Sequence, residues 1–314
     1  MESLSGWWGE KREPLRNDAD MALKETLLRP VRGAVAKFPP LSKGERLGCG
    51  AIGLAALLLF VDTRLAAIPL AGYLILCVAA PFFPGSSFFL PVVSRGSTGK
   101  NAVALTFDDG PDPLTTPELL RVLEKHRVAA TFFVSGAKAA RHPGLLADIL
   151  DHGHTLGNHS FSHDMLGAFR SARTMASEIE QTQAALSAVG VTALAYRPPM
   201  GITGPRLGRL MRTKGMVLVN FSCRARDGGN RWIGNLAGRV LERIRPDDIL
   251  LLHDLTPKPA TRLPYWVNEV DRILKGLRDK GLEVLPLAEL IGRTVMEKGD
   301  RLKAEGGRRK AEGV

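Results

Sequence analysis

The stretch NAVALTFDDGP at residues 101–111 joins a short apolar run to a pair of acids and a turn. Residues 102–107 are typical of a β-strand, because the apolar run is short and ends in turn-forming residues. Asp108 and Asp109 stand where this strand ends. In a parallel α/β fold, functional side chains gather at the carboxyl ends of the strands, so this pair of acids is a candidate for chemistry.

The same alternation of apolar runs and amphipathic stretches continues along the chain. We expect strands at residues 102–107, 129–134, 155–157, 193–197, 216–221, 249–253 and 283–285. We expect helices between them at residues 117–126, 143–151, 173–189, 205–214, 233–244 and 265–280. This order predicts a parallel sheet with helical crossovers, and about seven such units favour a barrel over a short open sheet. The length of 314 residues suits one α/β barrel and an appendage.

The appendage precedes the barrel and is apolar. Between residues 47 and 93 the only charged residues are Asp62 and Arg64, which separate the apolar runs 47–61 and 65–83. The second run is long enough to cross a bilayer, whereas the first is marginal. Neither run has the amphipathic period of a helix that packs on a soluble domain. We therefore expect a membrane segment, either a helical hairpin or a single span.

The flanking charges bear on the topology of this segment and on the domain boundaries. Basic residues lie on both sides of it, which favours a hairpin with both ends in the cytoplasm. A single span would instead place the C-terminal domain outside. We expect an N-terminal arm of mixed charge at residues 1–46, a membrane region at 47–93, a catalytic domain at 94–292 and a charged tail at 293–314. The protein is thus expected at a bacterial cytoplasmic membrane, with its catalytic domain on the cytoplasmic side.

The composition excludes some classes of function. The 43 lysines and arginines exceed the 32 acids and give a net charge of +11, but the basic residues are spread along the chain and aromatic residues are only 6% of it. A stacking platform for single-stranded nucleic acid is therefore missing, and we expect no nucleic-acid partner. Three cysteines without paired spacing exclude a disulfide framework and a cysteine zinc site.

Polar residues also follow the later predicted strands. They are NHSFSH at 158–163, RPPMG at 197–201, Asp227, and His253 with Asp254. His159 and His163 are four residues apart, a separation that would place both imidazoles on one face of a helical turn. Adjacent Asp108 and Asp109 would point to different sides of an extended segment, so one could bind a metal while the other acts as a base. Each pattern alone is common on protein surfaces, but both at strand ends of one barrel favour a metal site.

These segments resemble the ordered motifs of a known family. TFDDGP at 106–111, NHSFSH at 158–163, RPPMG at 197–201 and LLLH at 250–253 are similar to the motifs of the polysaccharide deacetylases, carbohydrate esterase family four, with its NodB-like homology domain. The resemblance covers about residues 101–290. It implies a distorted (β/α) barrel of about seven strands that hydrolyses N-acetyl or O-acetyl groups of glycans with the help of a metal.

The resemblance also implies roles for single residues. Asp109, His159 and His163 match the metal ligands, and Asp108 matches the general base. Zinc is the default metal for such a ligand set, although cobalt, nickel or manganese could serve. A divalent ion there would lower the pKa of water and polarise the amide carbonyl.

The remaining roles concern proton transfer and charge stabilisation. His253 matches the general acid that protonates the leaving amine, and Asp227 matches the acid that orients it. Arg197 matches the residue that pairs with the base. The backbone N–H of Met200, where the family usually has Tyr, would stabilise the oxyanion.

One segment departs from the family pattern. The family commonly has Trp directly after the acid that corresponds to Asp227, whereas here the aromatic residue is absent or displaced to Trp232. Arg224 and Arg226 precede Asp227 and could bind a phosphate or carboxylate. We therefore expect a glycan or glycolipid substrate of anionic character, such as a lipid-linked sugar.

Three other functions are compatible with parts of this pattern. A non-catalytic, membrane-anchored glycan-binding barrel would keep the fold, but would be expected to lack a ligand, the base or the acid, and all of them are present. An O-acetyl esterase could use the same scaffold. A non-haem iron oxygenase could use two histidines and one carboxylate, but it has no clear use for Asp108 and His253.

Overall fold

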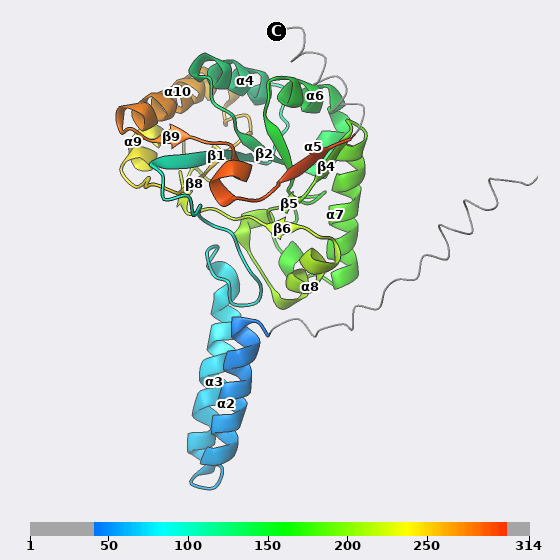
Figure 1. The fold of residues 1–314 in the computed structure, drawn as a ribbon, viewed down its shortest axis with the longest axis vertical. Coiled ribbons are helices and arrows are strands. Elements are labelled where there is room, and N and C mark those ends of the chain that lie inside the picture. The colour runs from blue at the N-terminus through cyan, green and yellow to red at the C-terminus, as the bar shows by residue number, and fades with distance from the viewer. Residues whose placement is uncertain (1–40, 300–314) are drawn as a thin grey trace, which may run out of the picture. The chain divides into compact units, whose positions relative to one another are not determined.

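The computed structural model describes residues 41–299, and Figure 1 shows their arrangement. Residues 1–40 of the predicted arm and residues 300–314 of the predicted tail lie outside the described residues.

A curled parallel sheet forms the centre of the fold. Its strands run in the order β6-β5-β3-β2-β1-β8-β7, and β9 pairs with the beginning of β1. The strands are β1 (Ala102–Asp108), β2 (Thr131–Val134), β3 (Thr155–Asn158), β5 (Ala195–Tyr196), β6 (Val217–Leu218), β7 (Cys223–Arg224), β8 (Ile249–His253) and β9 (Glu283–Val284). All pairs in this sheet are parallel, so the carboxyl ends of its strands meet at one end of the barrel, the mouth.

Helices cover the outside of the sheet, as Figure 1 shows. They are α4 (Thr115–His126), α5 (Gly136–Arg141), α6 (Pro143–Asp151), α7 (Ala172–Ser187), α8 (Pro205–Thr213), α9 (Leu236–Leu241) and α10 (Leu263–Asp279). The short helix α11 (Leu287–Ile291) instead packs with the inner-face residues Ala102 and Ala104. Short 3₁₀ segments lie at η1 (Ala80–Phe82), η2 (Gly167–Phe169), η3 (Pro199–Gly201) and η4 (Ala260–Arg262). Connections that alternate strand and helix produce this arrangement because parallel strands need a crossover between them.

The strand β1 shows how the sheet separates two apolar regions. Val103, Leu105 and Phe107 pack with residues of the surrounding helices, whereas Ala102 and Ala104 pack with apolar residues inside the barrel. Successive side chains of a strand point to opposite faces, so Thr106 and Asp108 follow Ala104 on the inner face. Apolar residues therefore fill the lower barrel, and polar residues begin near the mouth.

The barrel is not closed by strand pairing between the edge strands β6 and β7. The chain before β1 lies along this seam: Val93 bridges to Val219, and Arg95 bridges to Asp248. The Val93 N–H donates to the Leu218 carbonyl, and the Asn220 N–H donates to the Val93 carbonyl. This is the predicted distorted barrel.

Two apolar helices precede the barrel and lie side by side in Figure 1. α2 (Lys43–Leu58) begins with a capping box of Ser42 and Glu45, and α3 (Thr63–Ala79) begins with Asp62 as its cap. Their large apolar side chains are mostly exposed. Within residues 41–299, Thr63–Phe82 is the one helical stretch long and apolar enough to cross a membrane. The two predicted apolar runs are thus two helices.

The structure departs from the expected elements where they are short. The strand expected at 216–221 is shorter, with β6 limited to Val217–Leu218, and a separate strand, β7, follows it. A small antiparallel pair, β4 (Val191–Ala193) with β10 (Met296–Lys298), was not expected. Strands of two or three residues carry too few positions for a periodic pattern to mark them.

Candidate active site

The two adjacent acids at the end of β1 face the same place. Asp108 is buried on the inner face of β1, and Asp109 leaves the strand with a left-handed φ of 71°. Asp108 Oδ2 lies 3.7 Å and Asp109 Oδ1 lies 3.4 Å from His159 Nε2. The expectation that the two carboxylates point to different sides is therefore wrong, because Asp109 is not extended.

The two histidines meet, but not through a helix. The segment after β3 is irregular, and Ser160 and His163 have left-handed φ angles of 61° and 56°. The loop folds back so that the rings of His159 and His163 are 5.0 Å apart and His163 Nε2 lies 2.9 Å from Asp109 Oδ1. The predicted helical turn is wrong, although the two rings do come together.

Glu178 of α7 holds this histidine loop. Its carboxylate accepts hydrogen bonds from the backbone N–H groups of Phe161 (2.9 Å) and Ser162 (2.7 Å) and from the Ser162 hydroxyl (3.0 Å). The Gly136 N–H donates to the Ser160 carbonyl from the other side. Sequence reasoning missed Glu178, because nothing in a helix sequence indicates which distant loop its side chain contacts.

The orientation of His159 is set by a backbone contact. Its Nδ1 lies 2.8 Å from the Arg197 carbonyl oxygen, which can only accept, so Nδ1–H donates. Burial would lower the pKa of His159, but the charge of Asp108 and the hydrogen bond and charge of Asp109 raise it. Because Nδ1 carries the hydrogen that donates to this carbonyl, Nε2 is the nitrogen of the neutral ring that would bind a metal.

Asp109, His159 and His163 form a set of converging donor atoms. Their ligand atoms all lie within 4.8 Å of one another. Asp109 Oδ1 is buried and receives no well-aligned hydrogen bond, although both ring nitrogens are near it. Burial would raise the pKa of Asp109, but the two imidazoles beside it hold that pKa well below its ordinary value. An ionised oxygen and two imidazoles are ligands that suit zinc and similar divalent ions, so the residues present fit a metal.

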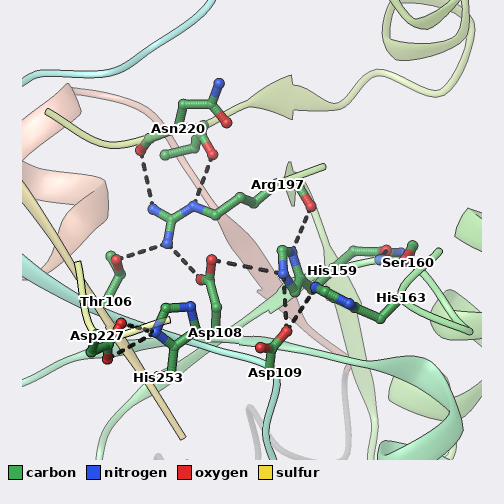
Figure 2. A network of polar contacts seen from close by, with 12 residues as sticks. Thr106, Asp108, Asp109, His159, Ser160, His163, Arg197, Asn220, Asp227 and His253 are labelled. Atoms are coloured by element: carbon green, nitrogen blue, oxygen red, sulfur yellow. Dashed lines mark hydrogen bonds and ion pairs between the residues drawn. The ribbon is translucent and has the colours of Figure 1, made fainter. Parts of the chain in front are cut away.

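Arg197 is a fully buried cation beside Asp108 (Figure 2). Its guanidinium donates to Asp108 Oδ1 (2.6 Å), to Thr106 Oγ1 (2.8 Å), and to the Val219 and Asn220 carbonyls (both 3.1 Å). Its charge lies 4.0 Å from the centre of the Phe133 ring. A buried cation needs such complete pairing, and in return it fixes the orientation of Asp108.

His253 and Asp227 form a second pair at the mouth (Figure 2). His253 Nδ1 lies 2.8 and 3.0 Å from the two carboxylate oxygens of Asp227. Burial would lower the pKa of His253, but the hydrogen bond and charge of Asp227, with the charges of Asp109 and Asp108, raise it to about 9. His253 lies beside Asp108 in the β1–β8 register, so a protonated imidazole stands next to a carboxylate.

A turn behind His253 contains a residue that sequence reasoning missed. The fully buried Asn230 donates to the His253 carbonyl (3.0 Å) and accepts from the Trp266 indole N–H (2.9 Å). The preceding pair of glycines was the available signal for a tight turn. The turn also brings the Trp232 N–H to the Asp227 carbonyl (2.8 Å). The displaced Trp232 therefore returns close to Asp227.

A buried acid, Asp254, supports the turn that carries Asp109. Its carboxylate accepts from the hydroxyls of Thr115 and Thr116, both at 2.6 Å, and its N–H donates to the Asp108 carbonyl. Burial raises the pKa of Asp254 to about 7. A Cβ at Gly110 would collide with this carboxylate, so the turn requires glycine.

The remaining predicted residues are not among these converging donor atoms. Met200 is exposed on the loop after β5 and has a left-handed φ of 60°. Arg224 and Arg226 do not join the metal-ligand set. They line a groove of about 370 Å³ at the seam of the barrel, together with Arg95 and Arg243.

Comparison with known sequences gives relatives of stated activity. The polysaccharide deacetylase family matches residues 95–219. A chitooligosaccharide deacetylase of Sinorhizobium fredii is 34% identical over 208 residues, which are 64% of this chain and 97% of that protein. A peptidoglycan-N-acetylglucosamine deacetylase of Listeria monocytogenes is 33% identical over 208 residues, which are 66% of this chain and 42% of that protein.

Comparison with solved structures gives the same kind of neighbour. A peptidoglycan N-acetylglucosamine deacetylase is similar with a TM-score of 0.60 and 29% identity, over 65% of this chain and 94% of that one. A family 4 carbohydrate esterase from Streptomyces lividans in complex with acetate is similar with a TM-score of 0.54 and 31% identity, over 63% of this chain and 98% of that one.

Proposed function

Because the chain belongs to the polysaccharide deacetylase family, we propose that it removes an N-acetyl group from a sugar at the barrel mouth. The family, the barrel fold and the hydrolase class expected from the sequence are confirmed by these similarities. The residue roles, the metal and the substrate are our proposals.

One observation carries the proposal. The oxygen and nitrogen atoms of Asp109, His159 and His163 converge, and the converging set is flanked by the Asp108–Arg197 pair and by His253. Amide hydrolysis needs an activated water, a base, and an acid for the leaving amine. This arrangement offers a residue for each need.

The three converging residues would hold the divalent ion. When bound, such an ion supplies Lewis acidity, which lowers the pKa of water and polarises the amide carbonyl. Zinc suits one carboxylate and two imidazoles, and cobalt, nickel or manganese are alternatives.

Asp108 would accept the proton of the attacking water. Its Oδ1 is occupied by Arg197 at 2.6 Å, while Oδ2 faces the histidines and the site. The hydrogen bond from a permanent cation fixes which carboxylate oxygen is free. Arg197 would therefore act as a positioning residue for the base.

His253 would give a proton to the leaving amine. Asp227 accepts the hydrogen bond from the Nδ1–H of His253, which leaves Nε2 for the substrate. Asp227 also raises the pKa of His253, so that the ring is protonated at neutral pH. An amine leaves only when protonated, because an amide anion is a very poor leaving group.

The Met200 N–H is our candidate donor to the developing oxyanion.

The substrate would be a glycan that contains N-acetylglucosamine. The relatives are named for chitooligosaccharides and for peptidoglycan N-acetylglucosamine.

We further propose that α2 and α3 attach the enzyme to a membrane, because their apolar side chains face outward and nothing in residues 41–299 covers most of them.

Acetate release tests the proposal. The full chain in detergent should release acetate from N-acetylated chitooligosaccharides, lose the activity in EDTA and regain it with zinc or cobalt. Asp108→Asn should lower kcat by about 10²- to 10⁴-fold, the usual contribution of a positioned base. Asp279→Asn, an exposed change at the end of α10, should leave kcat unchanged. Equal activity of the Asp108 variant and the wild type would refute the proposal.

A further inference from the structure

Large apolar side chains are exposed at one end of the barrel. After residue 83, the exposed ones in the described chain are Leu114, Met165, Leu166, Phe169, Met200, Trp232 and Tyr265. They lie on the connections after β1, β3, β5, β7 and β8, so all belong to the mouth. We call these residues the apolar rim.

The distribution of the apolar rim is more informative than its size. Single exposed apolar residues are normal on soluble proteins, where they are scattered. Here the opposite end of the barrel has no exposed large apolar side chain among residues 84–299, and the outer helices have one only in the first turn of α10, at Tyr265. A concentration on one face indicates a surface that is covered by something apolar.

The apolar helices join the barrel at this same end. Beyond α3, the Pro81 carbonyl accepts from the Thr203 N–H on the loop after β5. The Phe82 ring lies 6.2 Å from Phe169 of the apolar rim, and both side chains are exposed. The exposed apolar surface of the helices therefore continues into the mouth.

Basic side chains accompany the apolar rim. Exposed arginines on the mouth connections include Arg173, Arg206 and Arg231. The groove that Arg224 and Arg226 line also contains Pro84 and Gly85, which directly follow the apolar helices. Apolar and basic groups on one face are typical of surfaces that bind anionic membranes.

We propose that the apolar rim rests on the same bilayer that holds α2 and α3, so that the active site opens onto the membrane surface. The substrate is then the sugar head group of a lipid, linked through phosphate, and the arginine groove takes that phosphate. Guanidinium groups suit this role because they bind phosphate through paired hydrogen bonds. This inference rests on the proposed deacetylase function and narrows its substrate class.

Fluorescence quenching tests the contact with lipid. The full chain with Trp7→Phe and Trp8→Phe retains Trp232 on the rim and the fully buried Trp266. In phosphatidylglycerol and phosphatidylcholine vesicles with brominated acyl chains, Trp232 should be quenched. A matched variant that also carries Trp232→Phe reports Trp266 alone and should not be quenched. Equal emission of the first variant in brominated and ordinary vesicles would overturn the contact.

Activity tests the substrate class. The triple variant M165S/L166S/F169S should lose at least tenfold in kcat/KM on polyprenyl-phosphate-linked N-acetylglucosamine in vesicles, and should keep its activity on soluble chitooligosaccharides. The control K275S/D279S/K280S changes exposed residues at the far end of α10 and should match the wild type on both. If the rim variant loses nothing on the vesicle substrate, the inference fails while the proposed function stands. If the wild type deacetylates neither substrate, the proposed function itself fails.

Discussion

Asp108 and Asp109 are neighbours in the chain with different surroundings. Asp108 ends β1 inside the barrel, where Arg197 occupies one of its oxygens. Asp109 turns out of the strand through a left-handed backbone and faces His159 and His163. A carboxylate paired with a cation suits a base, and a carboxylate among imidazoles suits a metal ligand.

Asp227→Asn should shift the pH dependence of turnover. Asp227 raises the pKa of His253, so loss of its charge lowers that pKa. The general acid must be protonated, and a lower pKa means that the proton is lost at a lower pH. The alkaline limb of the kcat profile should therefore move to lower pH, which a pH–rate profile from pH 6 to 10 measures.

Metal content is the control for this change. Asp227 contacts His253 and not the metal-ligand set, so the variant should hold as much metal as the wild type. If the alkaline limb of the variant stays at the pH of the wild type, Asp227 does not raise the pKa of His253.

The candidate residues could be predicted from the sequence better than their geometry. His159 and His163 meet through left-handed residues of an irregular loop, which their four-residue spacing does not indicate. Arg224 and Arg226 line a separate groove. Glu178 and Asn230 were missed, and Asp254 was noted without its contacts, because these contacts join residues far apart in the chain.

The loop of the two histidines is held by one helix, α7. Glu178→Ala would leave the backbone N–H groups of Phe161 and Ser162 without their acceptor. Because these N–H groups fix the path of the chain to His163, the variant should bind zinc at least tenfold more weakly, as is usual when a residue that orients a ligand is lost. Competition with a fluorescent chelator measures this affinity.

Glu180 on the same helix provides the matched control. Its side chain is exposed and pairs with Lys214. Surface ion pairs contribute little, so Glu180→Ala should keep the zinc affinity and the stability of the wild type. Equal affinities of the two variants would show that Glu178 does not position the histidines.

Elements with a strong pattern were predicted well. The helix expected at 143–151 is α6, and the strand expected at 249–253 is β8. The two-residue strand β7 and the short helix α5 were missed. Such short elements owe their existence to neighbours, since β7 is defined by its pairing with β8.

The end of the barrel opposite the mouth contains a buried histidine that couples the fold to pH. His154 precedes β3, and its Nδ1 accepts from the Ala130 N–H (3.2 Å), while Nε2 is buried without a partner in the described chain. Burial, with the charge of His152, lowers the pKa of His154 to about 4.

His154 should make the protein less stable in acid. The unfolded chain binds a proton at this ring near pH 6.5, whereas the folded chain keeps the ring neutral down to about pH 4. The contribution of His154 to the free energy of unfolding is therefore complete above pH 6.5. It falls by up to about 3 kcal/mol as the pH decreases toward 4. His154→Asn keeps an acceptor for Ala130 and should flatten this part of the stability curve, measured by urea unfolding from pH 7 to 4. Parallel curves for the two proteins would exclude the effect.

The barrel as a whole could be predicted because strand and helix patterns alternate over most of its length. The seam could not. Val93 pairs with Val219, and Arg95 pairs with Asp248, in both cases more than a hundred positions away. No local sequence pattern indicates such pairing. The apolar rim was missed for a related reason, since its members come from five separate connections.

Metal content measured together with turnover tests whether Asp109, His159 and His163 hold the ion that the chemistry needs. We predict about one divalent ion per chain in the wild type and in Asp108→Asn, with turnover lost only in the latter, and loss of both the ion and turnover in Asp109→Asn. An Asp109→Asn protein that keeps its ion and its activity would show that the site works in another way.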